Sequence, residues 1–282
     1  MIFKRTTLTL LGLFIFQSLL FSQLQLAGND SVFEKKLLHE VKQLDQFIGR
    51  FNLSENIYGN KYPEEYKDSA KVHLSSYVSA RKKILKSLFD FENFKNDTAL
   101  IKGFINYVSE NSRFISFNDN NWFAEVNTTV QLNGNEKSAS IILQIEKNSK
   151  DEYKWVIKGV KADFLDINSK KTEDFINPMS HETYFINLKK VFENANQVKQ
   201  YAYKGFKQDD LSIFFYLISQ NKIQLKQINS ISYQFLQIDN YIFTIDFLNR
   251  ASFNSGWLIS HLIEANATQK EQYLESVLNI YK

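Results

Sequence analysis

The sequence contains no cysteine, and it has only two prolines and nine glycines among 282 residues. The absence of cysteine excludes disulfide bonds, thiol catalysis, zinc–thiolate sites and a lipid-modified amino-terminal cysteine. Because glycine and proline favour turns, their scarcity predicts a chain in which helices and strands dominate. With 44% hydrophobic and 23% charged residues, the composition is typical of a packed globular protein of one large domain or two ordinary ones.

A strong excess of charge is also missing. The formal net charge is +3, from 34 basic and 31 acidic residues. Loss of the amino-terminal leader, which carries Lys4 and Arg5 as its only charges, would lower it to 3 − 2 = +1. A nearly neutral chain lacks the basic surface that nucleic-acid binding requires, so no nucleic-acid partner is predicted.

The first residues have the pattern of a signal peptide. A basic start precedes an almost wholly apolar stretch at residues 8–21, which is short for a bilayer span, and Ser22 offers a small residue for cleavage. Residues 1–22 are therefore predicted to direct export to the periplasm or the cell surface, with cleavage after Ser22 or after Ala27. The alternative is an uncleaved leader, which would be the chain's only contact with the membrane.

The first half of the chain changes from a helical period to a strand period. Apolar residues recur every three or four positions in three stretches, which predicts amphipathic helices. These helices are expected at residues 31–52, 63–89 and 98–111. The period becomes two at 122–132, and Asn133-Gly134 follows as a hairpin signal. A first module at 30–166, ending in a three-stranded antiparallel meander, is therefore predicted.

A polar stretch at 167–180 predicts a linker to a second module at 181–282. This module repeats the order of helices and then three strands. Its helices are expected at 184–198 and 209–220, its strands at 231–238, 241–248 and 257–263, and a last helix after a capping box at Thr268 and Glu271. Similar segments at 104–111 and 214–221 leave open a decayed duplication or a chance likeness. The predicted fold class is α+β, with helices packed on antiparallel meander sheets.

Three helices thus precede a long-stranded meander, and the first helix ends in Phe-Ile-Gly-Arg-Phe-Asn at residues 47–52. This order resembles the NTF2-like arrangement of the cystatin-like class over about residues 30–165, which implies a curved sheet wrapped around helices. The chain is also similar to exported proteins of AT-rich bacteria that carry an early Arg50–Asn52 and a late Asn254–Trp257 segment. Neither segment is a catalytic signature, so the resemblance implies a fold and no reaction.

The curved sheet of NTF2-like folds forms a cone, and such folds can bind or convert small molecules at its open end. The resemblance therefore implies candidate ligand-binding residues there. These candidates are Arg50, Tyr58, Asp119, Trp122 and Glu125. Structural roles are the competing interpretation, because a cation suits the end of a helix and Trp122 shares a strand face with apolar residues.

The high aromatic content, with 25 phenylalanines and 14 tyrosines, is the other signal with a functional interpretation. Most of these residues follow core periods, but aromatic side chains in an exposed loop would form a recognition surface. Phe253, Asn254 and Trp257 are the candidates for an interaction surface. The competing interpretation is an ordinary strand connection, since its glycine requires no function.

Signatures of catalysis are scarce. His39, His73, His181 and His261 lack the spacing of a helical metal motif, so no metal and no cofactor are predicted. His261 lies on the apolar side of a predicted strand, where a core position is favoured over a pocket. Ser79 and Lys82 match S-x-x-K, but its companion motifs are absent, and so are a nucleophile elbow and a glycine-rich phosphate loop.

The leading hypothesis is therefore an exported, non-enzymatic interaction module or accessory component of a cell-envelope assembly, with a protein partner in the envelope. The alternative is a small-molecule-binding or weakly catalytic NTF2-like protein that uses a cavity in the first module. A deep cavity lined by Arg50 and a carboxylate would favour the alternative. A filled cone with an exposed aromatic patch would favour the interaction module.

Overall fold

The computed structural model describes residues 39–62, 75–95, 97–166, 202–203, 205–206, 208–251 and 254–280. The predicted leader, the linker at 167–180 and the helix at 184–198 lie outside these residues. The boundaries of the two predicted modules therefore remain a prediction.

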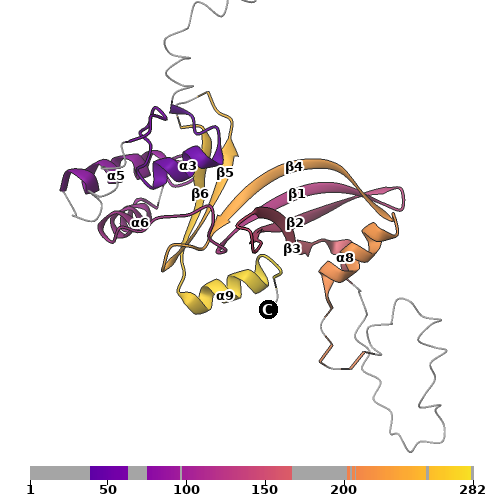
Figure 1. Ribbon diagram of the computed structural model, residues 1–282. Helices are drawn as coiled ribbons and strands as arrows, with labels where there is room; N and C mark the ends of the chain where they lie inside the picture. Colours follow the sequence, from indigo (N-terminus) through magenta and orange to yellow (C-terminus); the bar gives the residue numbers. More distant parts are fainter. Residues whose placement is uncertain are drawn as a thin grey trace, which may run out of the picture. The chain divides into compact units, whose positions relative to one another are not determined.

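The described helices are α3 (Leu44–Phe51), α5 (Ser75–Ser87), α6 (Thr98–Glu110), α8 (Asp210–Ser219) and α9 (Ala267–Ser276), with a short 3₁₀ helix η2 (Asp163–Leu165). The strands are β1 (Trp122–Leu132), β2 (Asn135–Lys147), β3 (Tyr153–Lys161), β4 (Ile223–Phe235), β5 (Tyr241–Leu248) and β6 (Gly256–Glu264). This mixture confirms the α+β class (Figure 1). None of the described helices is long and apolar enough to cross a membrane.

The six strands form one sheet in the order β3-β2-β1-β4-β5-β6. Each half of the chain contributes one meander, as the sequence predicts, but the two meanders are joined and do not form separate sheets. The junction is the antiparallel pairing of β1 with β4, which runs from Trp122 opposite Phe235 to Leu132 opposite Ile223. Without it, each of these long strands would present an unpaired backbone edge, so joining the meanders satisfies both edges at once.

The chain divides into two compact units that are discontinuous in sequence. Unit 1 comprises Met1–Phe117 and Asp246–His261, and unit 2 comprises Asn118–Ile245 and Leu262–Lys282. Unit 1 thus contains α3, α5 and α6 together with the connected ends of β5 and β6, whereas unit 2 contains most of the sheet with α8 and α9.

Helix α3 covers only the last part of the helix that the sequence predicts at 31–52. The predicted helix at 31–52 is interrupted, and α3 begins only after a non-helical stretch. In that stretch Val41 forms a parallel bridge with Gly256, and its carbonyl accepts a hydrogen bond of 2.8 Å from the N–H of Trp257. The helical period before α3 therefore gave a wrong boundary, because the backbone of Val41 bonds to a segment more than two hundred residues away.

The three described helices of unit 1 meet at Arg81, which is fully buried. Its guanidinium donates hydrogen bonds to the carbonyls of Phe51 (3.4 Å), Val108 (2.9 Å) and Arg113, and it lies 4.4 Å from the ring centre of Phe114. Phe51 and Val108 belong to the last turns of α3 and α6, where carbonyls have no partner within the helix. One side chain therefore satisfies two helix ends, and burial lowers the pKa of Arg81 to about 10.

Two segments outside the strands cover part of the outer edge of β6 in unit 1. One is the Val41 bridge to Gly256, and the other is a parallel bridge from Phe89 to Ile259. In the second bridge, Ile259 N–H donates to the carbonyl of Leu88 at 2.7 Å and its own carbonyl accepts from the residue after Phe89 at 2.9 Å. These bonds occupy backbone groups that an edge strand would otherwise expose.

The sheet of unit 2 carries apolar side chains on both faces. On one face Trp122 stacks on Phe235 at 5.4 Å, and Phe235 stacks on Phe243 at 4.9 Å. Farther along this face, a cluster includes Val130 and Phe214, the latter from α8. The period of two at 122–132 predicts a strand that is buried on one face only, and this prediction is wrong at Phe123, which is 3% exposed. Phe123 packs in a cluster that Tyr273 and Leu274 of α9 cover, and the strand pattern does not reveal this helix.

Two further boundaries differ from the sequence predictions, and so does the burial of Val277, which the period of the last helix predicts to be in the core. β4 begins eight residues before the predicted strand at 231–238, because its first part pairs with β1 although residues 224–230 are exposed. The capping box of the last helix is formed by Asn266 and Gln269, two residues before the predicted one. Val277, which the pattern placed in the core, is 39% exposed. Backbone pairing and a polar cap therefore override the periods of the side chains here.

Candidate interaction surface

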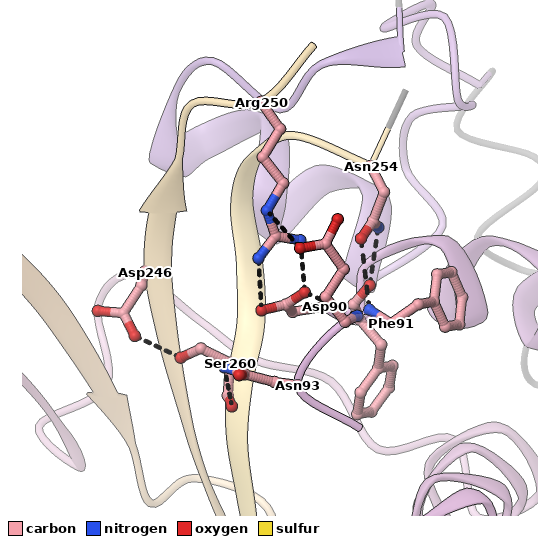
Figure 2. Close-up of polar contacts among 9 residues, drawn as sticks. Asp90, Phe91, Asn93, Asp246, Arg250, Asn254 and Ser260 are labelled. Carbon is pink, nitrogen blue, oxygen red and sulfur yellow. Dashed lines mark hydrogen bonds and ion pairs between the residues drawn. The ribbon is translucent and has the colours of Figure 1, made fainter. Parts of the chain in front are cut away.

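The loop that follows α5 is tied to the connection between β5 and β6 by a buried ion pair within unit 1. Asp90 is fully buried, and Nη1 and Nη2 of Arg250 lie 2.5 and 3.0 Å from its two carboxylate oxygens. Figure 2 shows the guanidinium facing this carboxylate. Nε of Arg250 also lies 3.5 Å from the exposed carboxylate of Glu92. The planar, two-bonded geometry fixes the direction of both side chains.

Asp90 is charged at neutral pH in spite of its burial. Burial alone raises the pKa of its carboxyl, but hydrogen bonds from Arg250 and from the backbone N–H groups of Glu92 and Asn93 outweigh that effect. The pKa of Asp90 is therefore lowered from its ordinary value of 3.8. A charged carboxylate that several donors hold is a strong anchor for the loop.

Asn254 fixes the same loop through a single side-chain amide. Its Nδ2 donates to the carbonyl of Phe89 at 2.8 Å, and its Oδ1 accepts from the N–H of Phe91 at 3.3 Å. The amide points toward the loop and bonds to the backbone on both sides of Asp90 (Figure 2). In this way Asn254 imitates the pairing of a neighbouring strand, so it positions the loop.

A second group of bonds ties the loop to the two strands. Ser260 donates its hydroxyl proton to Asp246 at 2.5 Å, which joins β6 to β5. Asn93 donates its side-chain amide to the carbonyl of Ser260 at 3.5 Å. Together with the ion pair and Asn254, these bonds form what we call the loop frame: Asp90, Asn93, Asp246, Arg250, Asn254 and Ser260.

Two exposed aromatic residues directly follow members of the loop frame in the chain, Phe91 after Asp90 and Phe247 after Asp246. The rings of Phe247 and Trp257 meet edge to face, with their centres 5.5 Å apart. Because strand residues alternate, this pair points to the face of β5 and β6 opposite to Asp246 and Ser260. Phe247 is 44% exposed and Phe91, on the framed loop, is 41% exposed. We use the name aromatic surface for Phe91 together with the Phe247–Trp257 pair. Of the predicted interaction residues, Trp257 belongs to this surface, Asn254 belongs to the frame, and Phe253 lies outside the described residues.

Sequence reasoning missed most members of both groups. Phe91 and Asp90 stand in the segment Phe-Asp-Phe-Glu-Asn-Phe at 89–94, which has three phenylalanines within six residues at the end of a helix. That density of aromatic residues beside two carboxylates was an available signal for a special loop. Arg250 offered no such signal, because its partner lies 160 positions away in the chain.

Two of the predicted ligand-binding residues lie in unit 1. Arg50 is 3% exposed, and its Nη1 and Nη2 donate to the carbonyls of His39 (2.6 Å) and Glu40 (3.3 Å). Burial lowers the pKa of Arg50, although the nearby Glu55 acts in the opposite direction. Tyr58 is half exposed and its ring lies 5.2 Å from that of His39. Arg50 thus holds the segment before α3 in place.

The other three candidates lie in unit 2. Trp122 is fully buried in the aromatic stack. Glu125 lies on the opposite face of β1, because strand residues alternate, and accepts bonds from Lys161 (2.5 Å) and Gln234 (3.2 Å). Asp119 accepts the N–H of Asn121 at 2.6 Å. Trp122 and Glu125 therefore cannot contact one ligand from the same side of the sheet.

The predicted core position of His261 is wrong, because this side chain is exposed at the end of unit 1's part of β6. Across the ranges that the structure describes, no three histidine or carboxylate side chains are grouped so as to hold a metal ion.

Replacing Asp90 with asparagine is expected to lower the free energy of unfolding by about 2–3 kcal/mol at neutral pH, because Arg250 loses a buried charged partner. The pKa of Asp90 is lowered in the folded state. Its contribution to the free energy of unfolding is therefore fully present at pH values above its ordinary pKa, and it is lost as the pH falls through the folded pKa. The difference between wild type and Asp90→Asn should thus be constant near neutrality and shrink below about pH 4.

Denaturant midpoints followed by circular dichroism across this pH range measure the effect, and hydrogen exchange of the loop locates it. Glu92→Gln is the matched control, because it removes a largely exposed carboxylate from the same arginine and should cost less than about 1 kcal/mol. Equal losses for the two variants would contradict the role assigned to the buried pair.

Comparison with known proteins adds no relative: no family model, no curated protein and no solved structure matches the chain significantly.

Proposed function

We propose that the chain is an exported protein that binds another protein of the cell envelope through the aromatic surface. The observation that carries this proposal is the display of Phe91 and Phe247, each more than 40% exposed, beside a loop frame held by the Asp90–Arg250 pair and Asn254. Exposed aromatic side chains on a fixed backbone are the usual anchors of protein interfaces.

The loop frame supports the proposal because it reduces the cost of binding. Ordering a loop and its side chains opposes association, and a loop that is already fixed avoids most of this cost. Here the backbone on both sides of Asp90 is held by the amide of Asn254. Phe91 is therefore presented on a backbone that needs no further ordering when a partner docks.

Export and location in the envelope rest on the signal-peptide pattern of residues 1–22. We also propose an NTF2-like relationship for the sheet, supported by its long antiparallel strands and by the irregular pairing of β1 with β4 near Asn127 and Thr129. Irregularities of this kind bend strands. The stack of Trp122, Phe235 and Phe243 fills one face of this sheet with aromatic rings, which favours the interaction module over an enzyme with an open cone.

The alternative, a small-molecule-binding or weakly catalytic NTF2-like protein, has one observation in its favour. Unit 2 contains a cleft of about 830 Å³ beside β3 and the start of α8. None of the five predicted ligand-binding residues is among the described residues that line this cleft. The chemistry of the cleft therefore depends on side chains that were not predicted to bind a ligand.

Site-specific photocrosslinking in the native host tests the proposed function. The full chain, carrying p-benzoylphenylalanine at position 91 or 247, is expected to give a light-dependent product of discrete mass in the envelope fraction. Mass spectrometry of the product identifies the partner and shows whether the chain begins after Ser22 or Ala27. Position 215 is the matched control, because Phe215 is 45% exposed but lies in unit 2.

Products at positions 91 and 247 and none at 215 would support the aromatic surface as the docking site. A processed, folded chain that gives no product at 91 or 247, or the same products at all three positions, would contradict it.

A further inference from the structure

The cleft in unit 2 lies between an edge strand and the beginning of a helix. Its volume is about 830 Å³. Its lining comes from β3, from Glu146 of the neighbouring β2, from the start of α8 and the two residues before it, from the residues on either side of η2, and from Asn279 near the carboxyl end. Among the strands that the structure describes, β3 is terminal and pairs with β2.

The order of the lining residues shows that the cleft runs along the edge of β3. Val156 and Ile157 are consecutive in the strand and both line the cleft. They pair in regular register with Gln144 and Leu143, whereas Lys158, which also lines the cleft, is the extra residue of a bulge before Gly159. Successive residues of a regular strand point to opposite faces of the sheet, so a cleft on one face would not meet both Val156 and Ile157. A cleft that meets both follows the unpaired backbone edge.

The carboxyl-terminal segment closes one end of this edge. Asn279 donates its side-chain amide to the carbonyl of Val160 at 2.7 Å. A Cβ atom at Gly159 would lie 3.1 Å from the carbonyl oxygens of Leu278 and Asn279, so this segment passes close over the strand. The open part of the edge is therefore the stretch of β3 before Gly159, which includes the three lining residues.

The cleft has a negative charge. Its lining contains four carboxylates, Glu146, Asp166, Asp209 and Asp210, and one basic side chain, Lys158. The hydroxyl and N–H of Ser212, together with the N–H of Leu211, outweigh the effect of burial and lower the pKa of Asp209.

The donors that hold Asp210 are uncharged. Its carboxylate accepts hydrogen bonds from the side-chain amides of Gln208 and Asn279, the latter at 3.0 Å. An amide donor orients a carboxylate without neutralising it. The remaining walls are apolar and include Val156, Ala162 and Leu211.

We propose that this cleft binds an extended, basic peptide segment of a partner protein by strand addition to β3. The backbone of the segment pairs with the open edge, which is an established way for a sheet to bind a peptide. Its lysine or arginine side chains meet the carboxylates, and the apolar side chains between them meet Val156 and Leu211. The inference rests on the proposed function as an interaction protein, but it concerns a different surface from the aromatic one.

Fluorescence anisotropy with a labelled peptide of alternating lysine and valine tests this inference on the processed full chain. We expect saturable binding that weakens at least about tenfold when glutamate replaces lysine in the peptide, because the cleft is negative. Two further peptides carry N-methyl groups on alternate backbone nitrogens, one at the odd and one at the even positions. Because only one set of nitrogens faces β3, one of the two peptides should lose binding and the other should keep it.

A double variant, Glu146→Gln with Asp166→Asn, should weaken binding about tenfold. Glu275→Gln is the matched control: it removes one exposed carboxylate from α9 of the same unit, away from the cleft. Equal binding by both N-methylated peptides would overturn strand addition, and unchanged binding by the double variant would overturn the assigned site.

A second copy of the chain is a distinct outcome of the same experiment. Sedimentation that shows a dimer which the lysine–valine peptide cannot dissociate would also overturn the inference, because the edge would then belong to self-association. Crosslinks at positions 91 and 247 are independent of all these results. If the peptide does not bind but the crosslinks at 91 and 247 form, the strand-addition inference fails and the proposed function stands. If the peptide binds but no crosslinks form at 91 and 247, only the aromatic surface is rejected.

Discussion

Arg81→Met is expected to lower the free energy of unfolding by about 3 kcal/mol, because it removes the hydrogen bonds that the guanidinium donates to three backbone carbonyls. The carbonyls belong to Phe51, Val108 and Arg113, at or just beyond the ends of α3 and α6, and that of Val108 keeps a bond from the N–H of Arg113 at 3.0 Å. Loss of a hydrogen bond to a buried carbonyl costs about 1–3 kcal/mol, and relief of the buried charge offsets part of the sum. Methionine keeps most of the apolar contact of the side chain, so the loss reports on the guanidinium.

Denaturant unfolding of the full chain, followed by circular dichroism, measures this loss. Hydrogen exchange should accelerate at the carboxyl ends of α3 and α6 before it does so in unit 2. Lys83→Met is the control, since it removes an exposed positive charge from the same helix, and it should change stability by less than about 0.5 kcal/mol. Arg81→Lys should fall between them, because one ammonium cannot span carbonyls on several elements. An Arg81→Met midpoint equal to that of the control would refute the role of the guanidinium.

Gly256→Ala is expected to lower the free energy of unfolding by about 3 kcal/mol, for two reasons that act together. Gly256 has a φ of +90°, a conformation that other residues rarely adopt, and an added Cβ would lie 2.4 Å from the carbonyl oxygen of Val41. The methyl group must therefore displace the backbone of Val41 and break its bridge to β6. Hydrogen exchange at Val41 and Trp257 should increase in parallel with the loss of stability.

Gly59→Ala separates the two causes. Gly59 also lies in unit 1 and has a φ of +78°, but among the described residues that are not its chain neighbours no atom lies within 4 Å of the position that a Cβ would take. In this variant only the backbone is strained, so the free energy of unfolding should fall by about 1 kcal/mol. Equal losses for Gly59→Ala and Gly256→Ala would mean that the close approach of Val41 contributes nothing.

Elements whose signal is local could be predicted from the sequence. The period of two in β1 and the turn at Asn133-Gly134 were sufficient for the first hairpin, and both turn residues have the positive φ that such a turn requires. α8 was likewise recognisable from Asp209, whose side chain accepts from the N–H groups of two residues in the first turn. In each case the residues that determine the structure are neighbours in sequence.

Features that depend on distant partners could not be predicted. Val41 looked helical by period but bonds to β6, and Phe123 looked exposed but is covered by α9. The early part of β4 carries no burial pattern, because its pairing with β1 and not a buried face defines it as a strand. A period reports only which side of an element is buried, and it cannot report which segment covers that side.

The candidate site shows the same division. Trp257 and Asn254 were recognisable as unusual residues in a connection, but the ion pair that fixes the loop joins positions 90 and 250. Arg50 and Glu125 were candidates for ligand binding, and the structure shows each of them bonded within the protein. What the sequence did not contain was their partners, two backbone carbonyls for Arg50 and Lys161 with Gln234 for Glu125.

The bridges from Val41 and Phe89 along β6 have a consequence for the way copies of this chain could associate. A sheet with two open edges can add a copy at each end and grow into a filament. In the part of the chain that the structure describes, these bridges obstruct the β6 edge, while the edge of β3 before Gly159 carries no such bridge. Copies that meet through β3 alone would use the same edge on both sides, so such an assembly would stop at a closed pair.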